Sequence, residues 1–354
     1  MDTRLRNLLD YSLDELTQEI KASGMPAFRA KQIYGWIYQG KDFDEMTNLP
    51  KDMRTKLAEK YSSGKLKIFR KLTSKLDGTI KYLFDTGDGN LIESVLMKYK
   101  YGYTACISSQ VGCKMGCTFC ASAKCGFIRN LTPGECLGQI IGMNADNGIT
   151  ITRVVIMGIG EPLDNYTNVL KFLELVNRED GLNIGYRHIS LSTCGLAEKI
   201  DDLAEKNLPI TLSISLHASD NETRSSIMPV NKKWNIERLL GACKNYYTHT
   251  GRRISFEYTL ISGKNDSREA ALALAALLNR HLRGVNDTMP IHVNLIPVNP
   301  VTESGFSSSE KKTVAEFAAT LERKGVRATV RRTLGADINA SCGQLRREEE
   351  QNKN

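Results

Sequence analysis

The chain has 354 residues, enough for one large domain with a sizeable core and a smaller accessory unit. Its composition, 41% hydrophobic and 25% charged, is that of an ordinary globular protein, and no segment approaches the roughly 18 consecutive apolar residues of a membrane helix. The formal net charge of +8 is compatible with a polyanionic partner such as RNA, although many basic proteins bind no nucleic acid.

Residues 1–63 are predicted to form a helical accessory domain. Ser12 and Glu15 have the spacing of a capping box at the start of a first helix, and Pro50 is placed to begin a third. In the second helix, "AFRAKQIYGWIY", the apolar spacing predicts that Phe28 and Ile33 face the core. The exposed basic residues suit phosphate groups and also suit water, so a three-helix cap and an RNA-docking module both remain open. Acidic residues near the start replace the apolar run of a secretion signal, so we expect a cytoplasmic protein.

Residues 64–100 change to a period of two, which predicts a short antiparallel β meander leading into the core. The segments "TIKYLF" and "LIESVLMKY" alternate, and two Asp-Gly pairs mark the turns. Glu93 falls on the same strand face as Val95 and Met97. Burying a carboxylate on an apolar face is costly unless it has a charged partner or a catalytic role. The pattern alone favours an edge position or an ion pair for Glu93 over a catalytic acid or base.

Residues 101–340 repeat the order strand, loop, helix, which predicts a parallel sheet that is either doubly wound or curled towards a barrel. No G-x-G-x-x-G fingerprint follows a strand, and this counts against a dinucleotide-binding fold. The expected strands are "TACISS", "RVVIMG", "HISLST", "ITLSISLH", "ISFEYTL", "IHVNLI" and "VRATVRR".

Unusual residues stand at or just beyond the carboxyl ends of these strands, the edge at which α/β proteins bind ligands. A loop rich in cysteine follows the first strand, and a Gly-Ile-Gly-Glu segment, 158–161, follows the second. Ser192 closes the third strand, residues 215–217 close the fourth, and Asn299 follows the sixth. The sequence therefore predicts one site built from many loops.

Three of the nine cysteines, Cys113, Cys117 and Cys120, have Cys-x3-Cys-x2-Cys spacing. Three thiolates can bind three irons of a 4Fe–4S cluster and leave the fourth iron open for a ligand. Zinc is the competing interpretation, with Cys106 or Cys125 as a fourth ligand, but the spacing is not the paired C-x2-C of most zinc modules. Simple packing is a poor explanation for three thiols in eight residues.

This spacing, with Phe119 before the third cysteine and βα units after it, resembles the radical S-adenosylmethionine enzymes. Within that superfamily, "CISSQVGCKMGCTFCA", "GFIRNLT", "MGIGEPLDN", "SLHA", "NLIPVNP" and "GADINASCGQL" resemble the dual-specificity adenine carbon-2 RNA methyltransferases nearly from end to end. The resemblance implies a partial (β/α)6 barrel over residues 101–340 and a C-terminal segment, 341–354, that carries a methyl-accepting cysteine.

The resemblance also implies the parts of the site. Cys113, Cys117 and Cys120 would bind the cluster, and two molecules of S-adenosylmethionine would be used in each turnover. The residues that would contact this cofactor are Gly160, Glu161, Ser192, Ser215, Leu216, His217 and Asn299.

For catalysis, the resemblance implies that Cys342 carries the methyl group and that Glu93 removes the ring proton, which reverses the expectation from the strand pattern. Cys106 would then attack the sulfur of Cys342 and release the methylated base by forming a disulfide. Cys125 and Cys194 are thiols for which the resemblance gives no role.

The implied substrates are an adenosine in 23S ribosomal RNA and one in the anticodon loop of some transfer RNAs. An electron donor and a dithiol reductant would be needed, and we expect a monomer. Arg331 and Arg332 are among the candidate phosphate contacts. Two alternatives stay open: methylation of carbon-8 of the same ribosomal adenosine, which confers antibiotic resistance, and a zinc-stabilised RNA-binding protein without enzymatic activity.

Overall fold

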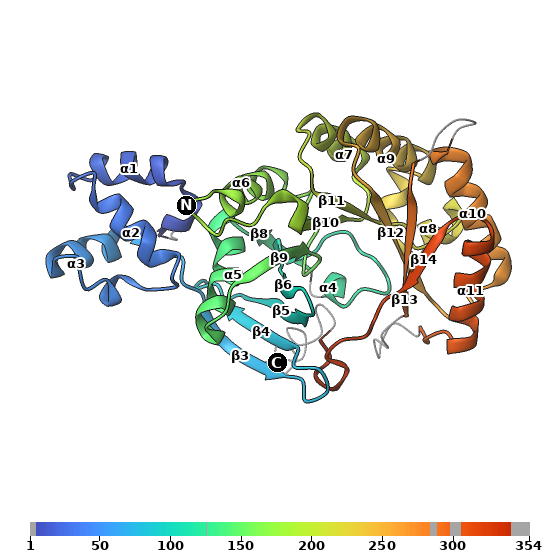
Figure 1. The fold of residues 1–354 in the computed structure, drawn as a ribbon, viewed down its shortest axis with the longest axis horizontal. Helices are drawn as coiled ribbons and strands as arrows, with labels where there is room; N and C mark the ends of the chain where they lie inside the picture. The colour runs from blue at the N-terminus through green and yellow to red at the C-terminus, as the bar shows by residue number, and fades with distance from the viewer. Residues whose placement is uncertain (1–4, 125, 284–288, 298–305, 341–354) are drawn as a thin grey trace.

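The computed structural model describes residues 5–124, 126–283, 289–297 and 306–340 (Figure 1). A sheet of ten strands runs through the larger part of the molecule in the order β14-β13-β12-β11-β10-β9-β6-β5-β4-β3. The helices α7, α9, α10 and α11 lie along one side of this sheet, and α1 to α3 stand apart at the N-terminal end (Figure 1). No helix in the described ranges is long and apolar enough to cross a membrane.

The seven expected strands are all present, and each pairs in parallel with the next. Their spatial order follows the chain without a reversal, which is the order of a curled barrel and not of a doubly wound sheet. The ends of the ten-stranded order are β14 and β3, so the barrel is partial, as the resemblance implied. The parallel strands are β6 (Gly102–Cys106), β9 (Ile151–Ile156), β10 (Ile189–Thr193), β11 (Thr211–Ser215), β12 (Ile254–Leu260), β13 (Ile291–Pro297) and β14 (Arg327–Val330).

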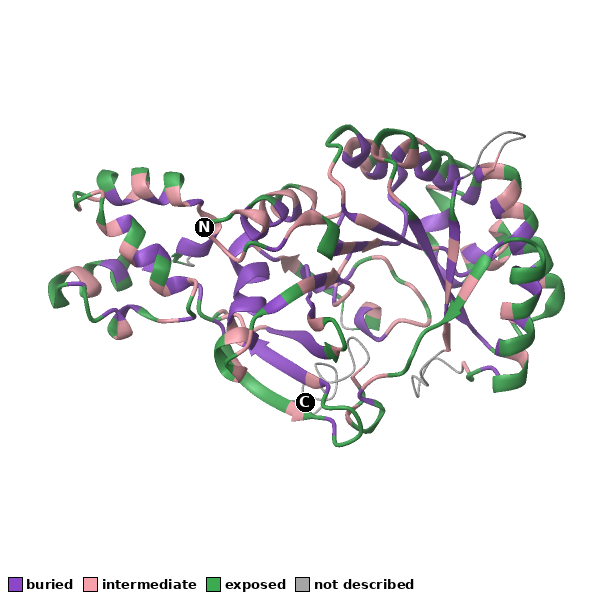
Figure 2. Ribbon diagram, viewed as in Figure 1, coloured by how far each residue is buried: buried purple, intermediate pink, exposed green. Residues whose placement is uncertain are grey.

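Helices connect successive parallel strands and bury one face each against the sheet. Exposed residues gather on their outer faces, whereas strands such as β12 are buried along their length (Figure 2). Helices such as α7 and α11 thus have the amphipathic pattern of a helix that covers a sheet, whereas the first nine residues of α5 are buried on every side. The helices are α5 (Pro133–Asn147), α6 (Tyr166–Asn177), α7 (Ala197–Glu205), α8 (Asn221–Ile227), α9 (Ile236–Thr250), α10 (Arg268–Leu282) and α11 (Lys311–Arg323).

The predicted meander is present as β3 (Lys67–Thr73), β4 (Ile80–Asp85) and β5 (Leu91–Tyr99), which pair antiparallel. Strand β5 also pairs antiparallel with β6, so the meander extends the barrel sheet instead of forming a sheet of its own. Glu93 and Cys106 are therefore brought to neighbouring strands of one surface, in which Val95 is the direct partner of Cys106.

The N-terminal region contains α1 (Leu13–Ala22), α2 (Arg29–Ile37) and α3 (Lys51–Lys60). The capping box of Ser12 and Glu15 is confirmed, and Ile33 is buried as expected. The prediction for Phe28 is wrong, because its side chain is 62% exposed. Helix α2 begins at Arg29, so Phe28 precedes the helical period, and the Arg29 guanidinium lies over its ring at 4.8 Å.

These N-terminal helices pack against the barrel through α5 and α6. The backbone N–H of Gly134 donates to the Asp10 carboxylate at 2.7 Å, and Lys171 pairs with Glu15 at 2.9 Å. Apolar residues of both regions belong to one continuous core. A boundary near residue 63 remains a prediction.

Candidate active site

The loop with the three cysteines is closed at its neck by backbone pairing. Strand β7 (Gln110–Gly112) pairs antiparallel with β8 (Phe127–Asn130), and the Cys113 N–H donates to the Gly126 carbonyl at 2.9 Å. Gly112 has φ +79°, and a Cβ there would lie 1.8 Å from the same carbonyl oxygen. Only glycine allows this approach, so the first thiol is held at a fixed point of the sheet edge.

Other contacts hold the loop without using its thiols. The Thr118 N–H donates to the Ile227 carbonyl at 3.0 Å, and the edge of the Phe119 ring meets the His217 ring at 4.9 Å. The short helix α4 (Ala121–Lys124) follows the third cysteine. The loop is thus attached to both α8 and the end of β11, and none of Cys113, Cys117 and Cys120 forms a disulfide within the described residues.

The three closely spaced thiols suit an iron–sulfur cluster, whose irons each take one thiolate. Burial raises the pKa of Cys113 to about 12 and also raises that of Cys117, and a metal would replace the proton on each sulfur. Across the described ranges, no three His, Cys, Asp or Glu side chains are placed round one metal ion. In a 4Fe–4S cluster each thiolate binds a different iron, so its ligands stand apart, whereas zinc needs four donors round one point.

The Gly158–Glu161 segment packs tightly against the residues that follow β6. A Cβ on Gly158 would lie 2.6 Å from the Ile107 carbonyl oxygen, and one on Gly160, at φ +110°, would lie 2.6 Å from the Gln110 Cβ. The buried Glu161 carboxylate accepts hydrogen bonds from the N–H groups of Leu163 at 3.0 Å and Cys194 at 2.7 Å. Burial raises the pKa of Glu161, and the bond from Cys194 opposes that shift.

The structure therefore gives Glu161 a second task beside the contact with the cofactor that the sequence predicts. Its carboxylate connects the loop after β9 to the loop after β10, the strand in which Ser192 is half-buried. Each carboxylate oxygen carries a second lone pair, so a bond to an ammonium group remains chemically open.

Ser215, Leu216 and His217 lie together at the end of β11. His217 has φ +57°, which is uncommon for a residue other than glycine, and Asn265 stabilises this turn by donating to the His217 carbonyl at 2.8 Å. The His217 Nδ1 accepts from the Thr259 N–H at 2.9 Å, so the neutral ring carries its proton on Nε2. Burial lowers the pKa of His217 to about 3, and the nearby Arg224 adds to the shift. The ring is a neutral donor at physiological pH.

Arg224, on α8, is fully buried beneath these loops and was not predicted as part of the site. Its guanidinium donates to the backbone carbonyls of Cys194 at 2.7 Å, Ser215 at 3.2 Å and Leu216 at 3.1 Å. One side chain thus joins the ends of β10 and β11, the two strands that carry Ser192 and Ser215. An arginine within a short helix gives no sequence signal for such a role.

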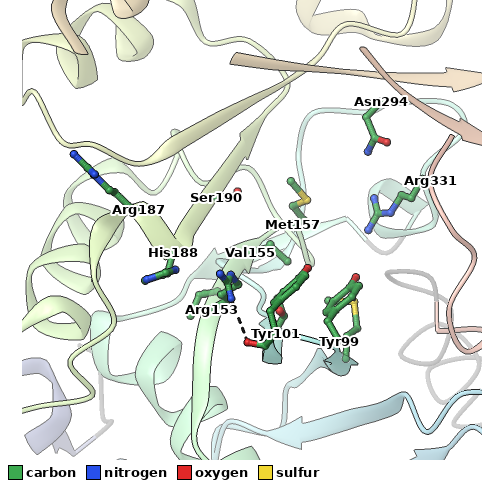
Figure 3. Close-up of a pocket in the computed structure, with 13 residues that line it drawn as sticks. Tyr99, Tyr101, Arg153, Val155, Met157, Arg187, His188, Ser190, Asn294 and Arg331 are labelled. Atoms are coloured by element: carbon green, nitrogen blue, oxygen red, sulfur yellow. Dashed lines mark hydrogen bonds between the residues drawn. The ribbon is translucent and has the colours of Figure 1, made fainter. Parts of the chain in front are cut away.

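A cavity of about 320 Å³ occupies the concave side of the sheet (Figure 3). The rings of Tyr99 and Tyr101 are stacked, with centroids 5.0 Å apart, and the Arg153 guanidinium lies 4.3 Å over Tyr101. Asn294 and Arg331 line the same cavity from the far edge of the sheet (Figure 3). An aromatic and cationic lining of this kind suits a nucleotide.

The polar lining of the concave face was missed in the sequence analysis. The Glu257 carboxylate accepts from the Ser255 hydroxyl at 3.1 Å and from the Asn294 amide at 2.7 Å, and Ser255 lies 3.1 Å from His292 Nδ1. Burial raises the pKa of Glu257. Alternate polar residues in "ISFEYTL" and "IHVNLI" were the available signal, because a strand buried on both faces is normally apolar throughout.

Glu93 and Cys106 lie on neighbouring strands at this concave face. The Glu93 carboxylate pairs with Lys81 Nζ at 3.2 Å, and both side chains are buried, with exposures of 3% and 0%. The ion pair that the strand pattern favoured is therefore present. Cys106 is buried in a small apolar cluster with Val95 and Met97, against which Ala340 packs.

Three of the predicted residues, Cys342, Asn299 and Cys125, lie outside the described residues. Within the described residues, Cys106 forms no disulfide. Cys194 is buried beside Glu161, and burial raises its pKa well above the ordinary value. The roles assigned to the site residues by resemblance stay predictions.

Two family models match the chain. The model described as "Radical SAM superfamily" matches residues 107–275, and the one described as "Ribosomal RNA large subunit methyltransferase N-terminal domain" matches residues 6–62. The second match covers the region that the sequence predicted as a helical accessory domain.

Whole proteins are similar to the chain over nearly its full length. A protein of Clostridium botulinum (strain Eklund 17B / Type B) named "Probable dual-specificity RNA methyltransferase RlmN" is 53% identical over 344 residues, covering 97% of both chains. One of Alkaliphilus oremlandii with the same name is 50% identical, covering 98% of this chain and 99% of the relative. The crystal structure of a radical SAM methyltransferase from Sphaerobacter thermophilus superposes with a TM-score of 0.89 at 42% identity, covering 96% of this chain and 98% of that one.

Proposed function

The chain belongs to the RlmN dual-specificity RNA methyltransferases of the radical S-adenosylmethionine superfamily, and from that premise we propose that it methylates carbon-2 of adenosine. The proposed substrates are an adenosine of 23S ribosomal RNA and one in the anticodon loop of some transfer RNAs. The family's 4Fe–4S cluster and S-adenosylmethionine are its cofactors. An electron donor and a dithiol reductant are proposed as partners, and RNA substrates of this kind place the enzyme in the cytoplasm.

One observation supports the proposed reaction between Cys106 and Cys342. Ala340, the last described residue of the chain, packs against the cluster of Val95, Met97 and Cys106. Cys342 stands two positions later in the sequence. The segment that leads to the proposed methyl carrier thus ends beside the cysteine that would attack it.

Carbon-2 of adenine has no nucleophilic lone pair, so ordinary methyl transfer from a sulfonium donor is not available to it. When bound, the cluster and S-adenosylmethionine supply a methyl group for the protein and a radical that activates it. Cys342 would carry that group as S-methylcysteine and become joined through its methylene carbon to carbon-2.

The chain's own side chains would then complete the reaction. The addition leaves one unpaired electron on the joined ring, which would return to the cluster; Glu93 takes the proton from carbon-2, and the electron pair of that bond stays in the ring. The thiolate of Cys106 attacks the sulfur of Cys342, the sulfur–carbon bond breaks, and the methylene carbon takes up a proton to become the methyl group. A dithiol reduces the resulting disulfide.

The target adenosine must leave its base stack to reach buried groups such as Glu93. We propose that RNA approaches the cavity on the concave face, where Tyr101 is 58% exposed and Arg153 and Arg331 supply positive charge. Exposed aromatic rings stack on bases of any sequence, and arginine pairs with phosphate.

The experiment that tests the proposal uses protein purified without oxygen and reconstituted with iron and sulfide. After incubation with S-adenosylmethionine, a reductant and protein-free ribosomal RNA, the digested RNA is analysed by mass spectrometry. The proposal predicts 2-methyladenosine together with 5′-deoxyadenosine, and loss of 2-methyladenosine in Cys342→Ala. Formation of 8-methyladenosine, or a zinc protein without turnover, would contradict it.

A further inference from the structure

Lys81 is a buried lysine on β4 that the proposed reaction does not yet use. On the antiparallel pair of β4 and β5, Lys81 is opposite Val95 and Leu83 is opposite Glu93. Lys81 and Glu93 are therefore diagonal neighbours on one face of the sheet, close enough for long side chains to meet. Their charged groups are 3.2 Å apart, and neither side chain has more than 3% exposure.

A buried ion pair keeps each partner charged. A carboxylate placed alone in an apolar interior favours its neutral, protonated form, because desolvation penalises the charge. The ammonium group of Lys81 supplies the opposite charge that a buried carboxylate needs. Glu93 can accept a proton only in its ionised form, so the proposed base depends on this neighbour.

The same nitrogen of Lys81 also holds the C-terminal part of the chain. Its Nζ donates to the backbone carbonyl of Asn339 at 2.8 Å. Asn339 has φ +45° and lies just after a 3-10 helix (Ala336–Ile338), so the chain direction at this point is set by a tight turn. One ammonium group therefore contacts both the carboxylate of Glu93 and the segment that leads to Cys342.

Further hydrogen bonds attach this segment to the turn between β3 and β4. The Asp337 carboxylate accepts from the Ser74 hydroxyl at 2.6 Å and from the Lys75 N–H at 2.8 Å, while the Gly335 N–H donates to Asp77 at 2.8 Å. The bond from Ser74 lowers the pKa of Asp337. The segment thus remains attached at its start when the contact with Lys81 is removed, which makes the two contributions separable.

We propose that Lys81 is a positioning residue for the deprotonation of carbon-2: its ammonium group pairs with the Glu93 carboxylate and holds the chain that leads to Cys342 beside that carboxylate. This inference rests on the proposed function. In the step concerned, the bond between carbon-2 and its hydrogen breaks, its electron pair stays in the ring, and the proton passes to an oxygen of Glu93. Lys81 touches neither RNA nor cofactor in this account and acts through its two neighbours.

Two substitutions separate the charge of Lys81 from its hydrogen bond. Lys81→Met removes both, whereas Lys81→Gln removes the charge and keeps a donor for the Asn339 carbonyl. Lys71→Met on the neighbouring strand β3 is the matched control, because it removes a partly exposed ion pair with Asp146 outside the site. All are made in the full chain and reconstituted with the cluster.

Four readouts distinguish a protein that fails to fold from one that folds but has lost the positioning role of Lys81. They are methylation of Cys342 by peptide mass spectrometry, covalent protein–RNA adduct on denaturing gels, 2-methyladenosine in the RNA, and hydrogen exchange of the peptide 331–340. For Lys81→Gln we expect normal methylation of Cys342, accumulated adduct and roughly 100-fold less 2-methyladenosine, which is the lower end of what a general base contributes. Exchange of the peptide stays normal in Lys81→Gln and rises in Lys81→Met.

Either of two results would overturn the inference. One is a folded Lys81→Gln protein that forms 2-methyladenosine within about threefold of the wild-type rate, well inside the factor expected of a lost base. The other is loss of product without any adduct, which would place the defect before deprotonation. A wild-type protein that forms no 2-methyladenosine contradicts the proposed function itself, so the two failures are distinguishable.

Discussion

Replacing Arg224 by Met is expected to destabilise the protein and to weaken its binding of S-adenosylmethionine. The guanidinium donates to the carbonyls of Cys194, Ser215 and Leu216, and to the Asn231 side chain at 2.9 Å. Methionine has a similar length and no donor. The substitution therefore leaves these four acceptors, and the more distant Trp234 carbonyl at 3.4 Å, without this partner and frees the loops after β10 and β11 from each other.

The magnitude follows from two opposing contributions. Each buried acceptor that loses its donor costs about 1–3 kcal/mol, so four of them cost at least about 4 kcal/mol. Against this, the variant no longer has to bury a charged group, which relieves several kcal/mol of desolvation. Four losses span about 4–12 kcal/mol, so a mid-range loss of about 8 kcal/mol less about 5 kcal/mol of relieved desolvation gives an expected net decrease of about 3 kcal/mol in the free energy of unfolding.

The assays are urea unfolding and equilibrium binding of S-adenosylmethionine to the reconstituted protein. Arg238→Met is the control, because Arg238 makes a partly exposed ion pair with Asp201 and its loss should change stability by less than about 1 kcal/mol. An Arg224→Met protein with the stability of this control and unchanged cofactor affinity would refute the assignment of Arg224 to the positioning of both loops.

Three other substitutions test separate parts of the site. Gly160→Ala places a Cβ 2.6 Å from that of Gln110 at φ +110°, so thermal unfolding should show a loss of about 1–3 kcal/mol and cofactor binding should weaken. Burial lowers the pKa of His217 from 6.5 to about 3, so its neutral ring contributes stability above pH 6.5 that is lost as the pH falls towards 3. Asparagine tolerates the positive φ at this position, so in urea unfolding His217→Asn should lose less stability between pH 6.5 and 4 than the wild-type protein does. Tyr101→Ala should raise the KM for RNA about fivefold or more, while Tyr101→Phe leaves it unchanged. A Tyr101→Ala protein with the wild-type KM would exclude base stacking on this ring.

The sequence contained enough to predict the barrel strands and the loop of Cys113, Cys117 and Cys120, because strand periodicity and ligand spacing are local properties. It also indicated an ion pair for Glu93, since a carboxylate on an apolar strand face needs a countercharge. It did not identify Lys81 as the partner, although the turn between the two strands makes them neighbours.

Other features could not be predicted because they depend on contacts between distant segments. The bond from Lys81 to Asn339 joins residues 258 positions apart, and Arg224 meets Cys194 across 30 positions. No local pattern encodes such pairs. Phe28 was placed wrongly because its helix begins one residue later than the apolar spacing suggested.

The central claim is that the methyl group reaches RNA by way of Cys342 and loses a hydrogen on the way. The most direct measurement uses S-adenosylmethionine whose methyl group carries three deuterium atoms, followed by mass spectrometry of the methyladenosine and the 5′-deoxyadenosine. The account predicts a methyl group on carbon-2 with two deuterium atoms and one hydrogen from solvent, and a deuterium atom in the 5′-deoxyadenosine. A product methyl group that keeps all three deuterium atoms would contradict it, because the group would then have passed to the RNA intact.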